Sequence, residues 1–294
     1  MGAISMSTEK VPSQLETRHR HQAAVVTPIY KPSLDQDESL ALAHNLKTLD
    51  QSPWILIHPP SNRSLIEGII RKNPTISITS IELEANNFTS IASYNKMLLS
   101  SFFYRQFVSY SHILIAQLDT LIFTDHLSKW AALGYAYVGS PWYLGIDNPK
   151  QPLQWLGGGN GGLSLRHVQA SLEVLARPRW LYRAIRRYEH QSLPGEWLRA
   201  EIRALRQLLE RSNGTSNTPQ MYEDLFWSFI APRLHPAFSV APPEIAINFA
   251  WELHPRAQYQ QRGQLPFGCH AWQRYDRAFW LDILKRLDAE TISD

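Results

Sequence analysis

Short apolar runs alternate with helix-like segments from residue 23 to residue 165, and this alternation is what most limits the fold. Runs rich in Val, Ile and Leu predict buried strands at 23–27, 54–58, 76–80, 112–118, 135–139 and 162–166. The segments between and after them predict helices at 36–50, 62–72, 91–108, 125–133 and 167–176. Such alternation is typical of an α/β domain with a mostly parallel central sheet flanked by helices. Residues 244–251 indicate an additional strand, antiparallel or at an edge.

The strand predicted at 112–118 ends in polar residues. Ile113-Leu114-Ile115-Ala116 is followed by Gln117-Leu118-Asp119. An acidic residue at the carboxyl end of a buried strand lies where open α/β sheets bind ligands. A carboxylate there is costly to desolvate unless it is paired or bound to a metal. Asp119 is therefore a candidate binding residue, and the alternative is an Asp that caps the next turn.

A glycine cluster follows about forty residues later. Five of the six residues 157–162 are Gly, in a chain that has 14 Gly in all. Glycine permits positive φ and close approach of the backbone to a ligand. A plain flexible turn accounts for the glycines but not for Asn160 among them. The cluster lacks the Gly-Lys-Ser/Thr of a P-loop, and it leads into a strand rather than a helix, unlike a dinucleotide fingerprint.

Two further polar sites lie later in the chain. Glu223-Asp224 precedes an aromatic, helix-like segment, and acidic residues at a helix start are favoured by the helix dipole alone. His270 stands in Pro266-Phe267-Gly268-Cys269-His270-Ala271-Trp272. A packed core histidine is the alternative to a metal ligand at that position.

At these residues the sequence resembles the domain of unknown function 5672 family, which is similar to GT-A glycosyltransferases. The matching stretches are Tyr94-Asn95-Lys96-Met97-Leu98, Gln117-Leu118-Asp119, Tyr137-Val138-Gly139-Ser140-Pro141-Trp142, Gly159-Asn160-Gly161-Gly162-Leu163-Ser164-Leu165-Arg166, Glu223-Asp224 and Phe267-Gly268-Cys269-His270-Ala271-Trp272. The order is that of the GT-A pattern: strand-end acid, glycine loop, Glu-Asp pair, late His. The resemblance implies a GT-A-like, Rossmann-like fold and transfer of a sugar from a nucleotide-sugar donor to an acceptor hydroxyl.

The resemblance also implies a divalent cation, Mn²⁺ or Mg²⁺, held by Asp119 and His270. Gln117 stands where the usual Asp-x-Asp motif has its first Asp. A glutamine can exchange hydrogen bonds with a ribose hydroxyl, but it supplies no negative charge. One carboxylate and one imidazole, completed by phosphate oxygens and water, suit an octahedral shell that is more manganese-like than calcium-like.

The chemical step is implied by the Glu-Asp pair. In inverting members of the fold its Asp is the general base, which makes Asp224 the candidate base and Glu223 its neighbour. Retaining enzymes also place acids in this area, so the stereochemistry stays open, with inversion preferred. A non-catalytic sugar-nucleotide or carbohydrate-binding protein on the same fold is the alternative function, and Gln117 favours it. Arg166 can face a diphosphate or pair with an acid.

The resemblance places the donor after the first strand, against Thr27, Pro28 and Tyr30. Tyr30 can stack on a base, and a UDP-sugar is the favoured donor. Asn95 and Lys96 lie in the helix predicted from residue 91, where Lys96 can meet a phosphate or face solvent. The remaining predicted donor contacts are Gln117, Leu118, Asn160 and Gly161.

The length of the chain allows one large domain or two small ones. The chain has 294 residues, of which 44% are hydrophobic, and we expect a single domain over 23–294 after a disordered tail at 1–22. No stretch reaches the length of a transmembrane helix. The single cysteine, Cys269, has no partner for an intramolecular disulfide, which fits a cytoplasmic location.

Charge is concentrated in one segment. The formal net charge is only +3, yet residues 177–211 hold nine Arg against four Glu. Residues 177–220 are predicted to form a helical insertion and loop. Acceptor recognition, peripheral contact with an anionic membrane and an ordinary solvated helix are the three interpretations of 177–211. Nucleic-acid binding is disfavoured by the mild net charge and the lack of a recognisable motif.

Overall fold

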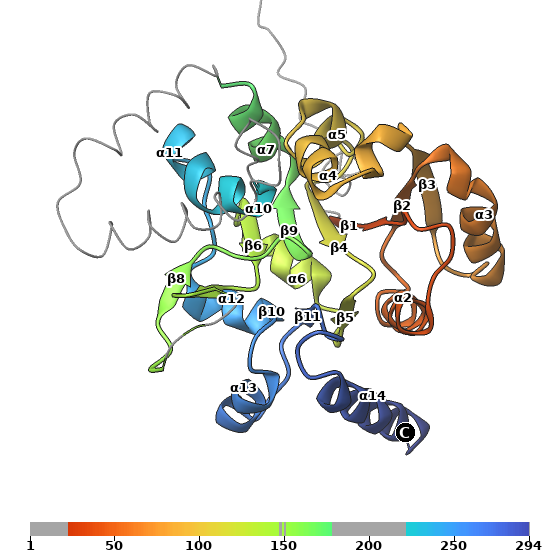
Figure 1. Cartoon of the computed structure of the whole chain (residues 1–294), viewed down its shortest axis with the longest axis vertical. Helices are drawn as coiled ribbons and strands as arrows, with labels where there is room; N and C mark the ends of the chain where they lie inside the picture. Colours follow the sequence, from red (N-terminus) through yellow and green to blue (C-terminus); the bar gives the residue numbers. More distant parts are fainter. Residues whose placement is uncertain (1–22, 147–148, 150, 178–221, 294) are drawn as a thin grey trace, which may run out of the picture.

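A six-stranded sheet forms the centre of the molecule (Figure 1) in the order β3-β2-β1-β4-β9-β6. The computed structural model describes residues 23–146, 149, 151–177 and 222–293. The strands of this sheet are β1 (Ala23–Pro28), β2 (Trp54–His58), β3 (Ile78–Glu82), β4 (His112–Ala116), β6 (Tyr137–Gly139) and β9 (Leu163–His167). The first four pair in parallel, whereas β9 is antiparallel to both β4 and β6. The predicted mostly parallel α/β sheet is confirmed.

Helices bury both faces of this sheet. The helices over one face are α2 (Gln36–Thr48), α3 (Arg63–Lys72), α6 (Leu127–Ala132) and α12 (Pro243–Phe249). Those over the other face are α4 (Ile91–Leu98), α5 (Ser101–Arg105), α7 (Val168–Leu175) and α11 (Ala231–Leu234). Along β4, Leu114 packs into the first core, and Ile113 and Ile115 pack into the second. Burial on both faces explains why β1, β2 and β4 are largely apolar runs.

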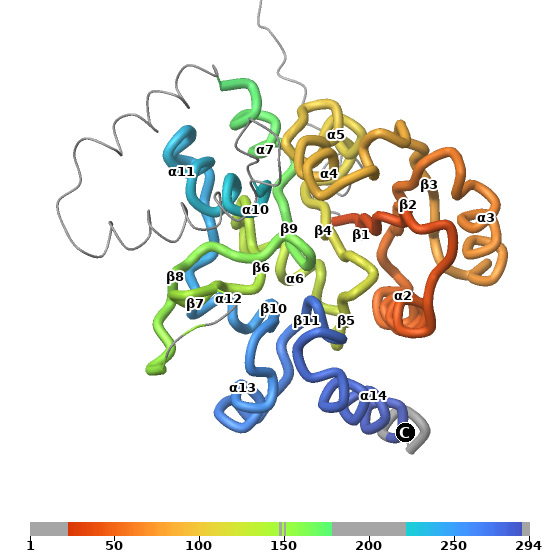
Figure 2. Tube along the Cα trace, viewed as in Figure 1, coloured from red at the N-terminus to blue at the C-terminus, as the bar shows by residue number. Residues whose placement is uncertain are grey.

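A second, three-stranded sheet brings the late part of the chain to the end of β4. It consists of β10 (Ala250–Trp251), β11 (Gly268–His270) and β5 (Thr120–Ile122), in that order. Figure 2 shows β11 beside β5, although the two strands are far apart in the sequence. The helices α13 (Pro255–Arg262) and α14 (Arg277–Ser293) follow β10 and β11. Residues of β5, β10, β11 and α14 share a third apolar core that includes Leu121, Trp251 and Trp280.

The remaining elements surround the glycine cluster. Strands β7 (Trp142–Tyr143) and β8 (Trp155–Gly157) pair antiparallel immediately before it. A short helical segment follows Tyr222, beginning with α10 (Glu223–Leu225) and continuing through one π-helical turn at Phe226–Ile230 into α11. Two further single turns are 3₁₀ helices, at Pro60–Asn62 and Ala85–Phe88.

Two sequence predictions are corrected here. The helix predicted at 91–108 is two helices, because Ser100 accepts a hydrogen bond from Phe103 N at 3.2 Å and caps the start of α5. The strand predicted at 244–251 is wrong, since these residues are mostly α12 and only the last two form β10. Pro243 occupies the first turn of α12, where its missing N–H costs nothing. The segment has the apolar content of a buried strand, but in the helix Ala246 and Phe249 pack into the first core while Ile247 packs into the third.

Other predictions fall on residues that the structure does not describe. The tail at 1–22 lies outside the described residues, as does the Arg-rich insertion beyond Arg177. Within the described residues, no helix combines the length and the apolarity that crossing a membrane requires.

Candidate active site

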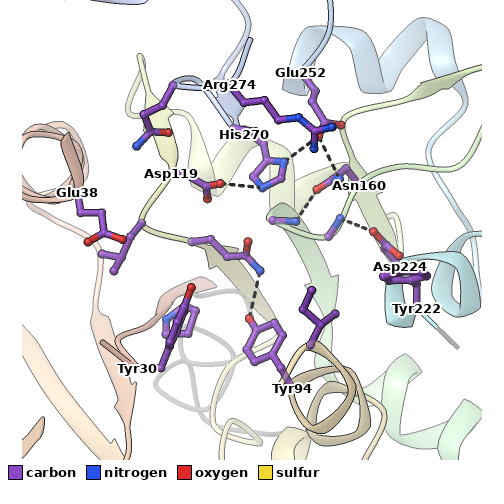
Figure 3. A pocket seen from close by; sticks show the side chains of 18 of the residues that line it. Tyr30, Glu38, Tyr94, Asp119, Asn160, Tyr222, Asp224, Glu252, His270 and Arg274 are labelled. Carbon is purple, nitrogen blue, oxygen red and sulfur yellow. Dashed lines mark hydrogen bonds and ion pairs between the residues drawn. The ribbon is translucent and has the colours of Figure 1, made fainter. Parts of the chain in front are cut away.

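An open cleft of about 1180 Å³ lies at the carboxyl ends of β1 and β4 (Figure 3). Its walls come from the end of β1, from α4, from the turn between β4 and β5, from the glycine cluster, from α10 and from the ends of β10 and β11. The predicted site residues that line it are Pro28, Tyr30, Asn95, Gln117, Leu118, Asp119, Asn160, Gly161, Glu223, Asp224 and His270. Six separate stretches of the chain therefore meet in one cavity.

Two predicted donor contacts are not among the residues that line this cleft. Thr27 is 2% exposed inside β1. Successive side chains of a strand point to opposite faces, so Thr27 points away from the face on which Pro28 lines the cleft. Lys96 lies on the exposed side of α4, while its neighbour Asn95 is buried and faces the cleft. Adjacent residues of a helix point in different directions, so a helix that offers Asn95 to the cleft turns Lys96 away from it.

Strand pairing brings Asp119 and His270 together. Strand β5 runs antiparallel to β11 with Thr120 opposite His270, so Asp119, one residue earlier, lies beside the histidine. Asp119 Oδ2 is 3.5 Å from His270 Nε2. Neighbouring ligands of one Mn²⁺ or Mg²⁺ lie roughly 3 Å apart, so a small movement would let both atoms reach the same ion. Within the described part of the chain, no group of three or more His, Cys, Asp or Glu is arranged to hold a metal.

Glu252 is a site residue that the sequence reasoning missed. Strands β10 and β11 are parallel with Trp251 opposite Cys269, which places Glu252 next to His270. Its Oε1 lies 3.2 Å from His270 Nδ1 and 3.4 Å from Asn160 Nδ2. The available signal was an acid directly after an apolar run, the same signal that identified Asp119.

The charge of His270 follows from these neighbours. Burial disfavours the imidazolium, but Asp119 and Glu252 outweigh burial and raise the pKa of His270 from 6.5 to about 9. With both ring nitrogens near carboxylates and a pKa of about 9, this histidine is protonated at neutral pH. Two negative charges facing one imidazole make this corner of the cleft suited to a cation.

The glycine cluster allows other parts of the protein to approach closely. Gly157 and Gly158 have φ of 92° and 66°, in the region that favours glycine. A Cβ added to Gly161 would overlap the carboxylate of Glu223, and one added to Gly162 would overlap the imidazole of His270. Asn160 closes the turn, because its Oδ1 accepts a hydrogen bond from Gly162 N at 2.7 Å.

Asp224 faces the cleft from the start of α10 and is held by two backbone N–H groups. Its Oδ2 accepts from Gly161 N at 3.3 Å and its Oδ1 accepts from Leu225 N at 2.9 Å. Burial and the neighbouring charge of Glu223 raise the pKa of Asp224 from 3.8 to about 7. A carboxylate poised in this way can accept a proton near neutral pH.

Glu223 is engaged in a buried ion pair. Arg166 Nη1 lies 2.7 Å from Glu223 Oε2, and Nη2 donates to Oε1 at 2.8 Å, with side chains 1% and 4% exposed. Arg166 also donates to Ser164 Oγ and to Gly161 O, and the backbone N–H of Glu223 donates to Asn95 Oδ1. Of the two alternatives for Arg166, pairing with an acid is the one observed. The pair joins β9, the glycine cluster and α10.

We expect Gly162→Ala to disturb the site, because the added methyl group can fit only if His270 moves. The expected cost is about 1–3 kcal/mol in the free energy of unfolding, measured by urea denaturation. Gly68→Ala in α3 is the matched control, since a Cβ there has nothing within 4 Å and alanine favours a helix. A Gly162→Ala protein as stable as the wild type would contradict this close approach.

The fold and the cleft define the class: an α/β protein with a cleft lined by acidic residues and a histidine at the ends of its parallel strands. The chain belongs to the family described as Protein of unknown function (DUF5672), whose model matches residues 77–270. No curated protein matches the sequence.

Solved structures with similar folds include two glycosyltransferases. The apo-form glycosyltransferase GlyE of Streptococcus pneumoniae TIGR4 is 11% identical, with a TM-score of 0.43 over 85% of this chain and 54% of its own. TarS 1–349 of S. aureus in complex with UDP-GlcNAc is 11% identical, with a TM-score of 0.34 over 51% of this chain and 46% of its own. A glycosyltransferase involved in the glycosylation of the major capsid of PBCV-1 is 12% identical, with a TM-score of 0.37 over 85% of this chain and 92% of its own. The chain thus spans about half the length of the first two, and its function is inferred below from its own residues.

Proposed function

We propose that this chain is a metal-dependent glycosyltransferase, which moves a sugar from a nucleotide-sugar donor to an acceptor hydroxyl with inversion. The observation that carries the proposal is the meeting of two features in one cleft. Asp224, with its pKa raised to about 7, and the Asp119–His270 pair line the same cavity. A base for an acceptor and a cation site for a diphosphate are the two things that such a transfer requires.

Asp119 and His270 are the residues that would hold Mn²⁺ or Mg²⁺, with donor phosphates and water as the other ligands. A carboxylate oxygen and an imidazole nitrogen suit these cations. When bound, such a cation offsets the negative charge that develops on a departing nucleoside diphosphate. Gln117 lies in the same turn and lines the cleft, where its amide can hydrogen-bond a ribose hydroxyl.

Asp224 is the proposed general base. The N–H groups of Gly161 and Leu225 fix its carboxylate, and a pKa near the working pH favours proton transfer from an acceptor hydroxyl. Glu223 supports this role from behind: it stays tied to Arg166, and its charge helps to raise the pKa of Asp224.

The donor base is assigned to the side of the cleft away from Glu252, where Tyr30 and Tyr94 lie (Figure 3). Tyr30 is 51% exposed, so its ring is free to stack on a base, and a UDP-sugar is the favoured donor. Pro28 and Asn95 line the same cavity. The acceptor is a hydroxyl compound that approaches Asp224.

A non-catalytic sugar-nucleotide or carbohydrate-binding protein is the second candidate function. It is favoured by Gln117, an uncharged residue whose Nε2 lies 3.5 Å from Tyr94 Oη. Release of nucleoside diphosphate from UDP-, GDP- and CMP-sugars, measured with Mn²⁺ and with a chelator, separates the two functions. We expect metal-dependent release, and binding without any release would favour the second candidate.

The rate of this reaction should rise with pH. Because Asp224 acts as a base only when ionised, and its pKa is about 7, kcat/KM is expected to increase about tenfold per pH unit below 7 and to level off above it. The profile is measured at saturating Mn²⁺, with donor binding followed at each pH as the control. A rate that is constant or falls from pH 5.5 to 8 would contradict the assignment.

A further inference from the structure

One carboxylate contacts both halves of the proposed site. Glu252 Oε1 lies within hydrogen-bonding distance of His270 Nδ1, at 3.2 Å, and of Asn160 Nδ2, at 3.4 Å. Its side chain is only 14% exposed and lies at the end of β10, where parallel pairing with β11 fixes it. Figure 3 shows Glu252 behind His270, on the side away from Tyr30. The contacts therefore come from a largely buried side chain directly after a paired strand.

The contact between Glu252 and His270 Nδ1 determines the orientation and the tautomer of the His270 ring. Because Nδ1–H donates to Glu252, the other nitrogen, Nε2, is the one that faces Asp119 and the cleft. A carboxylate behind an imidazole in this way fixes the tautomer and the ring orientation, and it makes the outward nitrogen more basic. Glu252 thus determines which atom His270 offers to a ligand.

The second contact reaches the glycine cluster. Asn160 donates to Glu252 through Nδ2, while its Oδ1 accepts from Gly162 N at 2.7 Å. The N–H of the preceding residue, Gly161, donates to Asp224 Oδ2 at 3.3 Å. A chain of hydrogen bonds therefore runs from His270 through Glu252 and Asn160 to the loop that holds Asp224.

We propose that Glu252 is a positioning residue, which holds His270 and the Asn160 turn in register so that the cation end and the base end of the cleft keep a fixed geometry. This role rests on the proposed function, because it concerns the same two ends of the cleft. It assigns no contact between Glu252 and the reacting atoms.

The test compares Mn²⁺ affinity, measured by electron paramagnetic resonance on the full chain, among the wild type, Glu252→Ala and Glu252→Gln. Removal of a carboxylate behind a metal-binding histidine typically weakens metal affinity by about 10–100-fold, and we expect a loss of this size for Glu252→Ala. Glu252→Gln keeps the size and the acceptor oxygen, and we expect a smaller loss. Glu244→Gln on the exposed side of α12 is the matched control and should bind as the wild type does.

A second variant tests the link to the loop. Asn160→Ala removes the other partner of Glu252, and its effect on Mn²⁺ affinity should not add to that of Glu252→Ala, because both break one chain of contacts. Additive losses would show that the two residues act separately, which would overturn the coupling.

A second measurement does not depend on metal binding: the nitrogen-15 NMR spectrum of the His270 imidazole. Its signals are identified as those that disappear in His270→Asn. In the wild type we expect a protonated, hydrogen-bonded Nδ1 signal, which Glu252→Ala should shift or abolish. If the wild type binds no Mn²⁺, the metal part of the proposed function fails, and this signal alone decides the role of Glu252. The proposal is overturned if Glu252→Ala and Glu252→Gln both bind Mn²⁺ within about twofold of the wild type. If Glu252→Ala does not fold, the Mn²⁺ affinity of Glu252→Gln alone decides.

Discussion

Asp224→Asn is expected to lower the rate of sugar transfer by about 10²–10⁴-fold, the range that a general base contributes. Asparagine has nearly the same shape, but its single side-chain oxygen can keep only one of the two hydrogen bonds that the carboxylate accepts, from Gly161 N at Oδ2 and from Leu225 N at Oδ1. It cannot accept a proton. Donor affinity should therefore remain within about twofold of the wild type, which calorimetry with a donor nucleotide can establish.

The same variant has a predicted effect on stability, and its sign follows from the pKa. The folded protein raises the pKa of Asp224 from 3.8 to about 7, so ionisation costs stability as the pH rises through that window. Asparagine never ionises, so the melting temperature of Asp224→Asn relative to that of the wild type should rise as the pH increases from 3.8 to about 7, on top of the pH-independent cost of the lost hydrogen bond. Asp125→Asn, at an exposed position outside the cleft lining, is the control and should change neither property. Full transfer activity in Asp224→Asn would show that another group is the base.

Arg166→Met is expected to cost about 3–5 kcal/mol in the free energy of unfolding, because it leaves the carboxylate of Glu223 buried without its counter-ion. The two side chains are 1% and 4% exposed, so little water can replace the lost partner. The guanidinium also donates to Ser164 Oγ and Gly161 O, and these acceptors lose a donor as well. Urea denaturation measures the loss.

Two comparisons test whether the unpaired buried charge of Glu223 causes the loss of stability in Arg166→Met. Replacing both partners, in Arg166→Met with Glu223→Leu, should recover much of the loss, because no unpaired charge remains. Arg63→Met breaks an exposed pair with Glu82 and should leave the unfolding free energy unchanged. If Arg166→Met is no more destabilising than Arg63→Met, the buried pair does not join β9 to α10 as described.

Local sequence patterns predicted the central sheet well, because β1, β2 and β4 are each marked by an apolar run. The strands at 23–28 and 54–58 match their predicted ranges to within a residue. The segment 244–251 was misjudged because a short run in which six of eight residues are apolar can be a buried strand or a short helix packed between two cores. A single cap at Ser100 divided the helix predicted at 91–108.

The candidate site was predictable in its residue types and less so in its contacts. Asp119 and His270 meet because of the register between β5 and β11, which no local pattern reveals. Glu252 escaped notice for the same reason, since its neighbours come from the pairing of β10 with β11. Lys96 and Thr27 were assigned to the donor by position in the sequence, whereas side-chain direction turns them away from the cleft. Long-range pairing, not composition, determines which polar groups share the cavity.

The most direct test of the central claim is calorimetric titration of the wild type and Asp119→Asn with UDP-, GDP- and CMP-sugars, each with Mn²⁺ and with a chelator. The account predicts that a nucleotide sugar binds the wild type in Mn²⁺, and that binding weakens at least about tenfold with the chelator and in Asp119→Asn. Failure of every nucleotide sugar to bind, or equal binding by Asp119→Asn, would contradict the claim that this cleft holds a donor through a cation.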